Sequence, residues 1–115
     1  MILEDFPSTA VARTLSPNGR AHWAVKKQAR EAVEWVVGIA IFEQRLYGME
    51  GPVRIIYRWV LPARRRRDLD NHSTGVVKVV QDCLVRLDLI EADDTSCVVG
   101  ITTEIAYEKG ARRLE

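Results

Sequence analysis

The sequence predicts a single α+β domain of two layers, with helices packed on one face of a small mixed β-sheet. At 115 residues, the chain is long enough for one hydrophobic core and too short for two. Hydrophobic residues make up 47% of the chain and charged residues 29%, which is typical of a folded globular protein. Helical and strand-like hydrophobic patterns also alternate along the chain. We therefore treat residues 1–115 as one domain.

The first 22 residues are expected to be largely irregular. Pro7, Pro17 and Gly19 interrupt this segment and leave room for at most one short strand near Ala10 to Leu15. The N-terminus lacks the basic-then-apolar order of a signal peptide, and no segment reaches the roughly 20 apolar residues of a membrane span. These features predict a cytoplasmic protein.

An amphipathic helix is predicted from Trp23 to Leu46, because apolar residues recur there at intervals of three and four. Gly48, Gly51 and Pro52 follow it and are typical helix breakers. We interpret Trp35 as a core residue and Trp23 as the tryptophan placed to contact DNA.

A strand is predicted from Val53 to Leu61, where residues at alternate positions, including Trp59, form one apolar face. A second helix is predicted around Val76 to Leu87, with Ser73 or Thr74 as its N-cap. A second strand is expected over residues 97–107. The remaining residues have room for little more than a final edge strand.

Cysteine usage and net charge limit the possible functions. Cys83 and Cys97 lie in apolar surroundings without a Cys-x-x-Cys spacing, so we expect buried free thiols in a reducing compartment. The net charge of +1 excludes a uniformly basic surface that would coat nucleic acid. Attraction to phosphate must therefore be local, and the run from Arg64 to Arg67 provides it.

The stretch "RRRRDLDN" (64–71) combines this run with two carboxylates, Asp68 and Asp70. On an extended backbone both carboxylates leave from the same side of the chain. Neighbouring carboxylates repel each other unless a cation lies between them, and an all-oxygen site suits Mg²⁺, or Mn²⁺. If the second helix returns antiparallel to the preceding strand, the loop with Asp93 and Asp94 would lie beside Asp68 and Asp70.

The arginines and one lysine complete the hypothesis of a phosphate-processing site. Arginine holds a phosphodiester bidentately beside an acidic metal centre. Lys78, on the polar face of the second helix, would add positive charge near the transition state. His72 is not assigned as a ligand, because an oxygen-rich magnesium site does not require imidazole.

Structural interpretations of the same residues remain open. An arginine run on a loop is often only a solvated surface, and Asp-x-Asp-Asn is also a turn or helix-capping pattern. The Asp93–Asp94 pair, followed by Thr95, is equally typical of a plain turn. Lys78 and Asp82 have the spacing of an exposed ion pair on one helix face.

With these motifs in order, the chain resembles the RusA family of Holliday junction resolvases, whose members are often carried by phages and prophages. The resemblance rests on "RRRDLDN", on the lysine of "VVKVVQDCL", and on "DD" before a strand. It extends to "SPNGRAHW" before the first helix, so it covers nearly the whole chain and is densest over Arg65 to Val99.

The resemblance implies a homodimeric, magnesium-dependent endonuclease that cuts a four-way DNA junction by symmetric paired nicks. The catalytic carboxylates would be Asp68, Asp70 and Asp94, with Lys78 as the catalytic lysine. The residues that it implies for metal binding are Asp68, Asp70, Asp93 and Asp94. Those that it implies for DNA binding are Arg20, Arg64, Arg65, Arg66 and Arg67.

Two departures from the family pattern leave alternatives open. Lys78 follows Asp70 by eight residues, whereas the family lysine follows by about one helical turn. If the extra residues are helical, Lys78 is displaced by roughly 6 Å along the helix axis, whereas a longer loop before the helix would return Lys78 to its usual place. The family pattern also continues into a strand where this sequence ends at "RRLE". The alternatives are a catalytically impaired DNA-binding module of the same fold and a nuclease for flaps or other branched DNA.

Overall fold

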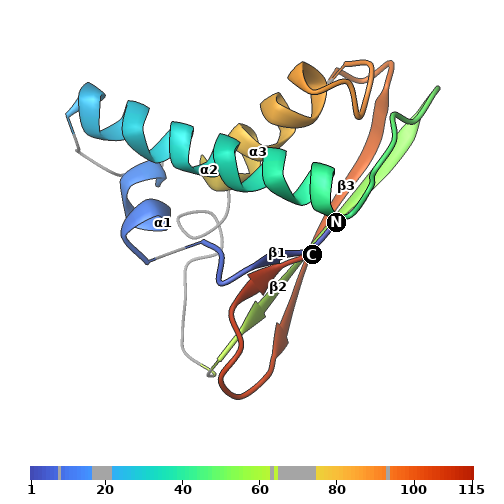
Figure 1. The fold of residues 1–115 in the computed structure, drawn as a ribbon. Helices are drawn as coiled ribbons and strands as arrows, with labels where there is room; N and C mark the ends of the chain where they lie inside the picture. Colours follow the sequence, from blue (N-terminus) through green and yellow to red (C-terminus); the bar gives the residue numbers. More distant parts are fainter. Residues whose placement is uncertain (8, 17–21, 63, 65–74, 93) are drawn as a thin grey trace.

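The computed structural model of the chain describes residues 1–7, 9–16, 22–62, 64, 75–92 and 94–115. It confirms an α+β domain with a mixed sheet, and Figure 1 shows the order of its elements. Within the described residues, no helix is both long enough and apolar enough to cross a membrane. The elements are β1 (Leu3–Glu4), α1 (Thr9–Leu15), α2 (Trp23–Glu43), β2 (Val53–Leu61), α3 (Gly75–Arg86), β3 (Val98–Tyr107) and β4 (Arg113–Leu114).

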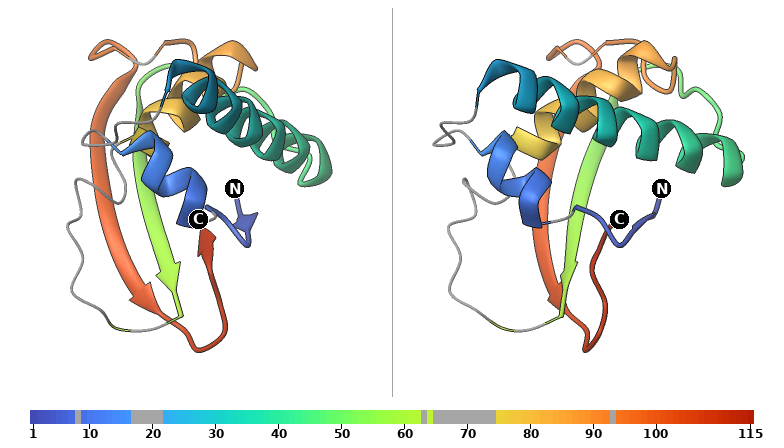
Figure 2. Two further views of the ribbon diagram at one scale, coloured as in Figure 1. Left: turned by 90° about the vertical axis from the view of Figure 1, so that its left-hand side faces the viewer. Right: turned by 60° about the vertical axis from the view of Figure 1, so that its left-hand side comes forward.

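The sheet has the strand order β1-β4-β2-β3, and the helices lie on one side of it (Figure 2). β2 and β3 are parallel, with Val53 opposite Val98 and Leu61 opposite Tyr107. The connection through α3 is a crossover, which is what joins neighbouring parallel strands.

The predicted strand over Val53–Leu61 is confirmed, and its alternation matches the burial as far as Trp59, after which Val60 is buried as well. Tyr57, Trp59 and Leu61 are buried on the side of the helices, whereas Arg54 and Arg58 are exposed on the other side. Trp59 is 0% exposed, which confirms its assignment to the core.

The first predicted helix is confirmed as α2, which ends at Glu43, slightly before the expected Leu46. Its buried stripe is formed by Ala29, Val33, Val37 and Ala40. The assignment of Trp35 to the core is wrong, because its side chain is 71% exposed. Two residues along a helix correspond to a rotation of about 200°, so Trp35 cannot share a face with the buried Val33.

The N-terminal segment differs from its prediction, because residues 9–15 form helix α1 in place of a short strand. Ala12 is buried in the core, and the end of α1 packs closely on the start of α3. A Cβ atom added to Gly75 would lie 1.7 Å from the carbonyl oxygen of Leu15. This helix is thus stabilised by tertiary packing that the local sequence does not reveal.

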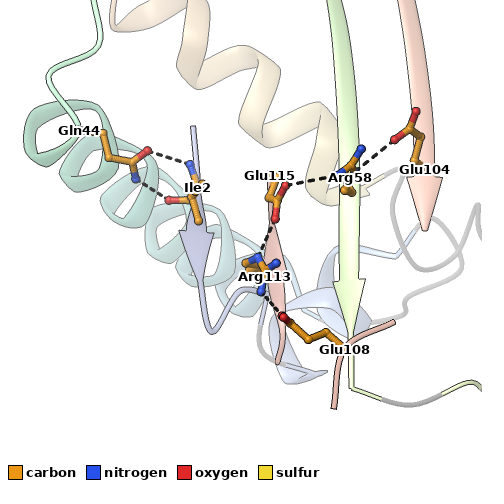
Figure 3. A network of polar contacts seen from close by, with 7 residues as sticks. All are labelled: Ile2, Gln44, Arg58, Glu104, Glu108, Arg113 and Glu115. Atoms are coloured by element: carbon orange, nitrogen blue, oxygen red, sulfur yellow. Dashed lines mark hydrogen bonds and ion pairs between the residues drawn. The ribbon is translucent and has the colours of Figure 1, made fainter. Parts of the chain in front are cut away.

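The final strand is not an edge strand, because β4 lies between β1 and β2. Arg58 and Glu115 exchange backbone hydrogen bonds of 3.0 and 2.9 Å. Charged side chains reinforce this end of the sheet: Arg113 contacts Glu108 and Glu115, and Arg58 contacts Glu104 at 3.3 Å (Figure 3). The last residues of the sequence therefore contribute to the interior of the sheet.

Candidate functional site

The structure describes three of the residues assigned to the predicted site, and each lies on a different element. Arg64 follows β2, Lys78 lies near the start of α3, and Asp94 precedes β3. The other assigned residues lie outside the described residues; they are Arg20, Arg65, Arg66, Arg67, Asp68, Asp70 and Asp93.

Arg64 is exposed and lies where β2 and β3 both end. Its guanidinium carbon is 4.9 Å from the ring centre of Tyr107, the last residue of β3. A guanidinium group over an aromatic ring gains a cation–π contact, and the N–H groups at its edge remain able to donate hydrogen bonds. Arg64 is therefore suited to bind a phosphate at this end of the sheet.

Lys78 projects from the first turns of α3, and its ammonium nitrogen lies 3.1 Å from Oδ1 of Asp82. The interpretation of these two residues as an ion pair on one helix face is confirmed. Both side chains are exposed, so water screens the pair and its contribution to stability is a few tenths of a kcal/mol. The positive charge of Lys78 also remains accessible from solvent.

Asp94 forms a turn that starts β3. Its Oδ1 accepts a hydrogen bond of 2.9 Å from the backbone N–H of Ser96 and another from the Ser96 hydroxyl. These hydrogen bonds lower the pKa of the Asp94 carboxyl below its usual value. The interpretation of this segment as a turn is confirmed from Asp94 to Ser96. The same contacts also keep an exposed carboxylate ionised, as a hard cation requires.

The strands do not bring Arg64 and Asp94 together. Asp94 precedes β3 at the end of the sheet where β2 begins, since the N–H of Val53 donates to the carbonyl of Cys97 at 2.6 Å. Arg64 lies at the opposite end, beside Tyr107. The ten residues of β3 separate these ends by about 30 Å. Whether the predicted site residues meet therefore depends on the segment between Leu61 and Gly75.

Of the residues predicted to bind metal, the structure describes Asp94 alone. Among the side chains that the structure describes, no three of His, Cys, Asp or Glu are arranged to share an ion. The donor chemistry of Asp94 fits Mg²⁺, because an ionised, oriented carboxylate is the ligand that this cation prefers. Its partners in the hypothesis, Asp68, Asp70 and Asp93, lie outside the described part of the chain.

Two surface features were not predicted as sites. A cavity of about 400 Å³ lies beside the first half of β2, lined mainly by apolar side chains, and Tyr57 contributes to its wall. Burial raises the pKa of the Tyr57 hydroxyl. The cavity combines residues distant in sequence, so no local pattern indicates it.

The second feature is a hollow of about 220 Å³ at the start of α2, lined in part by Trp23, Lys26 and Arg30. These three residues follow one another at intervals of three and four. That spacing places them along one stripe of the helix. The sequence therefore contained a signal for this feature, although only Trp23 was associated with DNA.

Comparisons with known proteins identify no family for this chain. A scan against protein-family models gives no match, and a search of curated proteins gives none either. The resemblance to the RusA family therefore rests on the motif residues and their order. The function that it implies stays a prediction to be tested by experiment.

Proposed function

We propose that the chain is a RusA-like, magnesium-dependent endonuclease that resolves four-way DNA junctions by symmetric paired nicks. The observation that carries this proposal is the ordered set of Arg67, Asp68, Asp70, Lys78 and Asp94 in the sequence. An Asp-x-Asp pattern alone is common in turns. Its combination with a preceding arginine run, a helix lysine and a second acidic pair is much more specific.

The described residues support the proposal through their exposure and charge. Asp94 presents an ionised carboxylate, and the hydrogen bonds from Ser96 fix its orientation. Lys78 and Arg64 are exposed cations on either side of the connection that contains Asp68 and Asp70. A phosphodiester approaching a group of carboxylates needs such cations to offset the repulsion.

Each group has a distinct role in the proposed reaction. Asp68, Asp70 and Asp94 would hold Mg²⁺, with Asp93 as an accessory ligand, and the arginine run would hold the DNA backbone. Bound magnesium supplies Lewis-acid stabilisation of the phosphate and of the departing oxygen. Lys78 adds a positive charge where negative charge develops in the transition state.

Symmetric cleavage has a consequence for assembly. Two nicks related by a two-fold axis require two active sites related by the same axis. A homodimer satisfies this requirement, because each copy then cuts one of two opposed strands. The proposal therefore includes a second copy of the chain as a partner, together with branched DNA.

One observation favours a second candidate, a DNA-binding module of the same fold with impaired catalysis. The Lys78 ammonium nitrogen lies 3.1 Å from Asp82, one turn further along α3. This contact directs the lysine along its own helix, and Lys78 also follows Asp70 by more residues than in the family pattern. A module of this kind would bind junctions without cutting them.

The test uses a labelled, mobile four-way junction, with duplex and flap DNA as controls, in Mg²⁺, Mn²⁺ or chelator. We expect paired, ligatable nicks in the junction that disappear in chelator and in the Asp70→Asn variant, with junction binding retained. Asp88→Asn is the matched control, because Asp88 is exposed and its φ of 58° is tolerated by asparagine.

Each outcome separates the candidates. Full cleavage by Asp70→Asn would refute the assignment of the metal site. Binding without nicks under every metal would indicate the non-catalytic module. Cleavage of flaps in preference to junctions would retain the chemistry and change the substrate.

A further inference from the structure

An exposed tryptophan and two cations surround the hollow between the end of α1 and the start of α2. The hollow has a volume of about 220 Å³ and is lined by Thr14, Leu15, Trp23, Lys26 and Arg30. Trp23 is 69% exposed, and its ring centre lies 5.4 Å from that of His22. An indole this exposed contributes little to the hydrophobic core, and its ring remains able to contact a ligand.

This end of α2 projects from the packed part of the domain. The first buried residue of the helix is Ala29, two turns after its start. The helix begins beside α1, at the opposite end from the chain termini (Figure 1). Among the described residues, the side chain of Trp23 is thus accessible to a ligand.

The cations of this surface are not neutralised by the described residues. Lys27, on the neighbouring face, lies 4.0 Å from Glu31, but neither Lys26 nor Arg30 has an ion-pair partner in the part that the structure describes. The first turn of α2 contains no acidic residue. The helix dipole favours carboxylates at this end and disfavours cations. Lys26, the fourth residue of α2, is therefore placed unfavourably for the isolated helix and suits an external anion.

We propose that this surface binds an unpaired nucleotide of branched DNA, with Trp23 stacked on the base and Lys26 and Arg30 paired with the flanking phosphates. Aromatic stacking combined with cations is how proteins bind unpaired strands without reading their sequence. Duplex DNA keeps its bases stacked, whereas the exchange point of a junction offers bases that can leave the stack. The inference rests on the proposed function, which supplies the branched substrate.

The first test measures binding of the full chain to a fluorescent four-way junction in chelator, where no cleavage occurs. We expect Trp23→Ala to weaken the affinity by about 5- to 140-fold, the loss that corresponds to one base stacked on an aromatic ring. Trp23→Phe should restore part of this loss. Trp35→Ala is the matched control, because Trp35 lies on the same helix, is 71% exposed and does not line the hollow.

The cations are tested by the salt dependence of binding. Replacing Lys26 and Arg30 with alanine should reduce the slope of log affinity against log salt by about 0.7 to 0.9 for each lost phosphate contact. Lys109→Ala, an exposed charge in the turn before β4, should leave the slope unchanged. An unchanged slope in the double variant would overturn the assignment of these cations.

The second test places 2-aminopurine at the exchange point of the junction, where stacking on an indole quenches its fluorescence. We expect quenching by the wild-type chain and by Trp35→Ala, and its loss in Trp23→Ala. Equal quenching in all three would overturn the inference, even if the junction is cleaved. Quenching that depends on Trp23 in a chain that cuts no DNA would overturn the proposed function and support this surface.

Discussion

The packing of α1 on α3 depends on the absence of a side chain at Gly75. A Cβ atom at this position would lie 1.7 Å from the carbonyl oxygen of Leu15 and 2.5 Å from its carbonyl carbon. Ordinary contacts between such atoms are about 3.5 Å, so Gly75→Ala requires a relative shift of roughly 2 Å. Both contacted atoms belong to the backbone and cannot rotate away.

The size of the effect follows from this geometry. Adding atoms to a packed interior costs about 1–3 kcal/mol, and a clash with backbone should lie at the upper end of that range. We expect Gly75→Ala to lower the free energy of unfolding by about 3 kcal/mol, which is a decrease in Tm of roughly 12 °C for a chain of this size. Gly38→Ala is the matched control, since a Cβ there meets nothing within 4 Å. It should stabilise α2 by about 0.5–1 kcal/mol.

The assay is urea unfolding followed by far-UV circular dichroism on both variants and the wild type. A Gly75→Ala variant within about 0.5 kcal/mol of wild type would refute the packing of α1 on α3. Junction cleavage provides a second readout, because Lys78 lies one turn from Gly75. A shift at the start of α3 should therefore lower the cleavage rate as well as the stability.

Three further predictions test the core and the site. Trp59→Ala should lower the free energy of unfolding by about 3–5 kcal/mol in urea titrations, because the indole is fully buried. Ser96→Ala should raise the pKa of Asp94 part of the way toward its usual value in an NMR titration of its carboxyl carbon, since it removes the hydroxyl hydrogen bond and leaves the one from the backbone N–H. The contribution of these hydrogen bonds to the free energy of unfolding is fully present above about pH 4, and it is lost as the pH falls through the lowered pKa of Asp94. Lys78→Ala should change stability by about 0.5 kcal/mol or less but reduce junction cleavage at least about tenfold, whereas Asp82→Asn should retain cleavage.

The sequence predicted those elements whose signal is local. The alternation of apolar residues in β2 defines both its bounds and its buried face, because side chains on a strand point to opposite sides. The stripe from Ala29 to Ala40 likewise identifies α2 and its buried face. A single misplaced residue such as Trp35 shows the limit of the pattern: hydrophobic character does not determine which side of the helix a residue occupies.

The features that were wrong or were not predicted depend on contacts between distant residues. The parallel pairing of β2 with β3 and the position of β4 inside the sheet are properties of the assembled sheet. Strand propensity is the same for either direction of pairing. The short helix α1 is held by contacts with α2 and α3, so the local sequence contained no sufficient signal for it.

The parallel pairing of β2 and β3 also determines how the proposed metal site can form. Asp94 and the end of β2 lie at opposite ends of strands about 30 Å long, so the carboxylates cannot meet through the strands themselves. The thirteen residues from 62 to 74 can span at most about 45 Å. Helix α3 is about 18 Å long and ends near the start of β3. Its first residue, Gly75, therefore lies between the two ends of β3, closer to Asp94 than the end of β2 is. Asp70 precedes that residue by five positions, at most about 18 Å of chain. A shared metal site with Asp94 therefore requires Asp70 to approach the start of β3, and loss of cleavage in both Asp70→Asn and Asp94→Asn would support such a site.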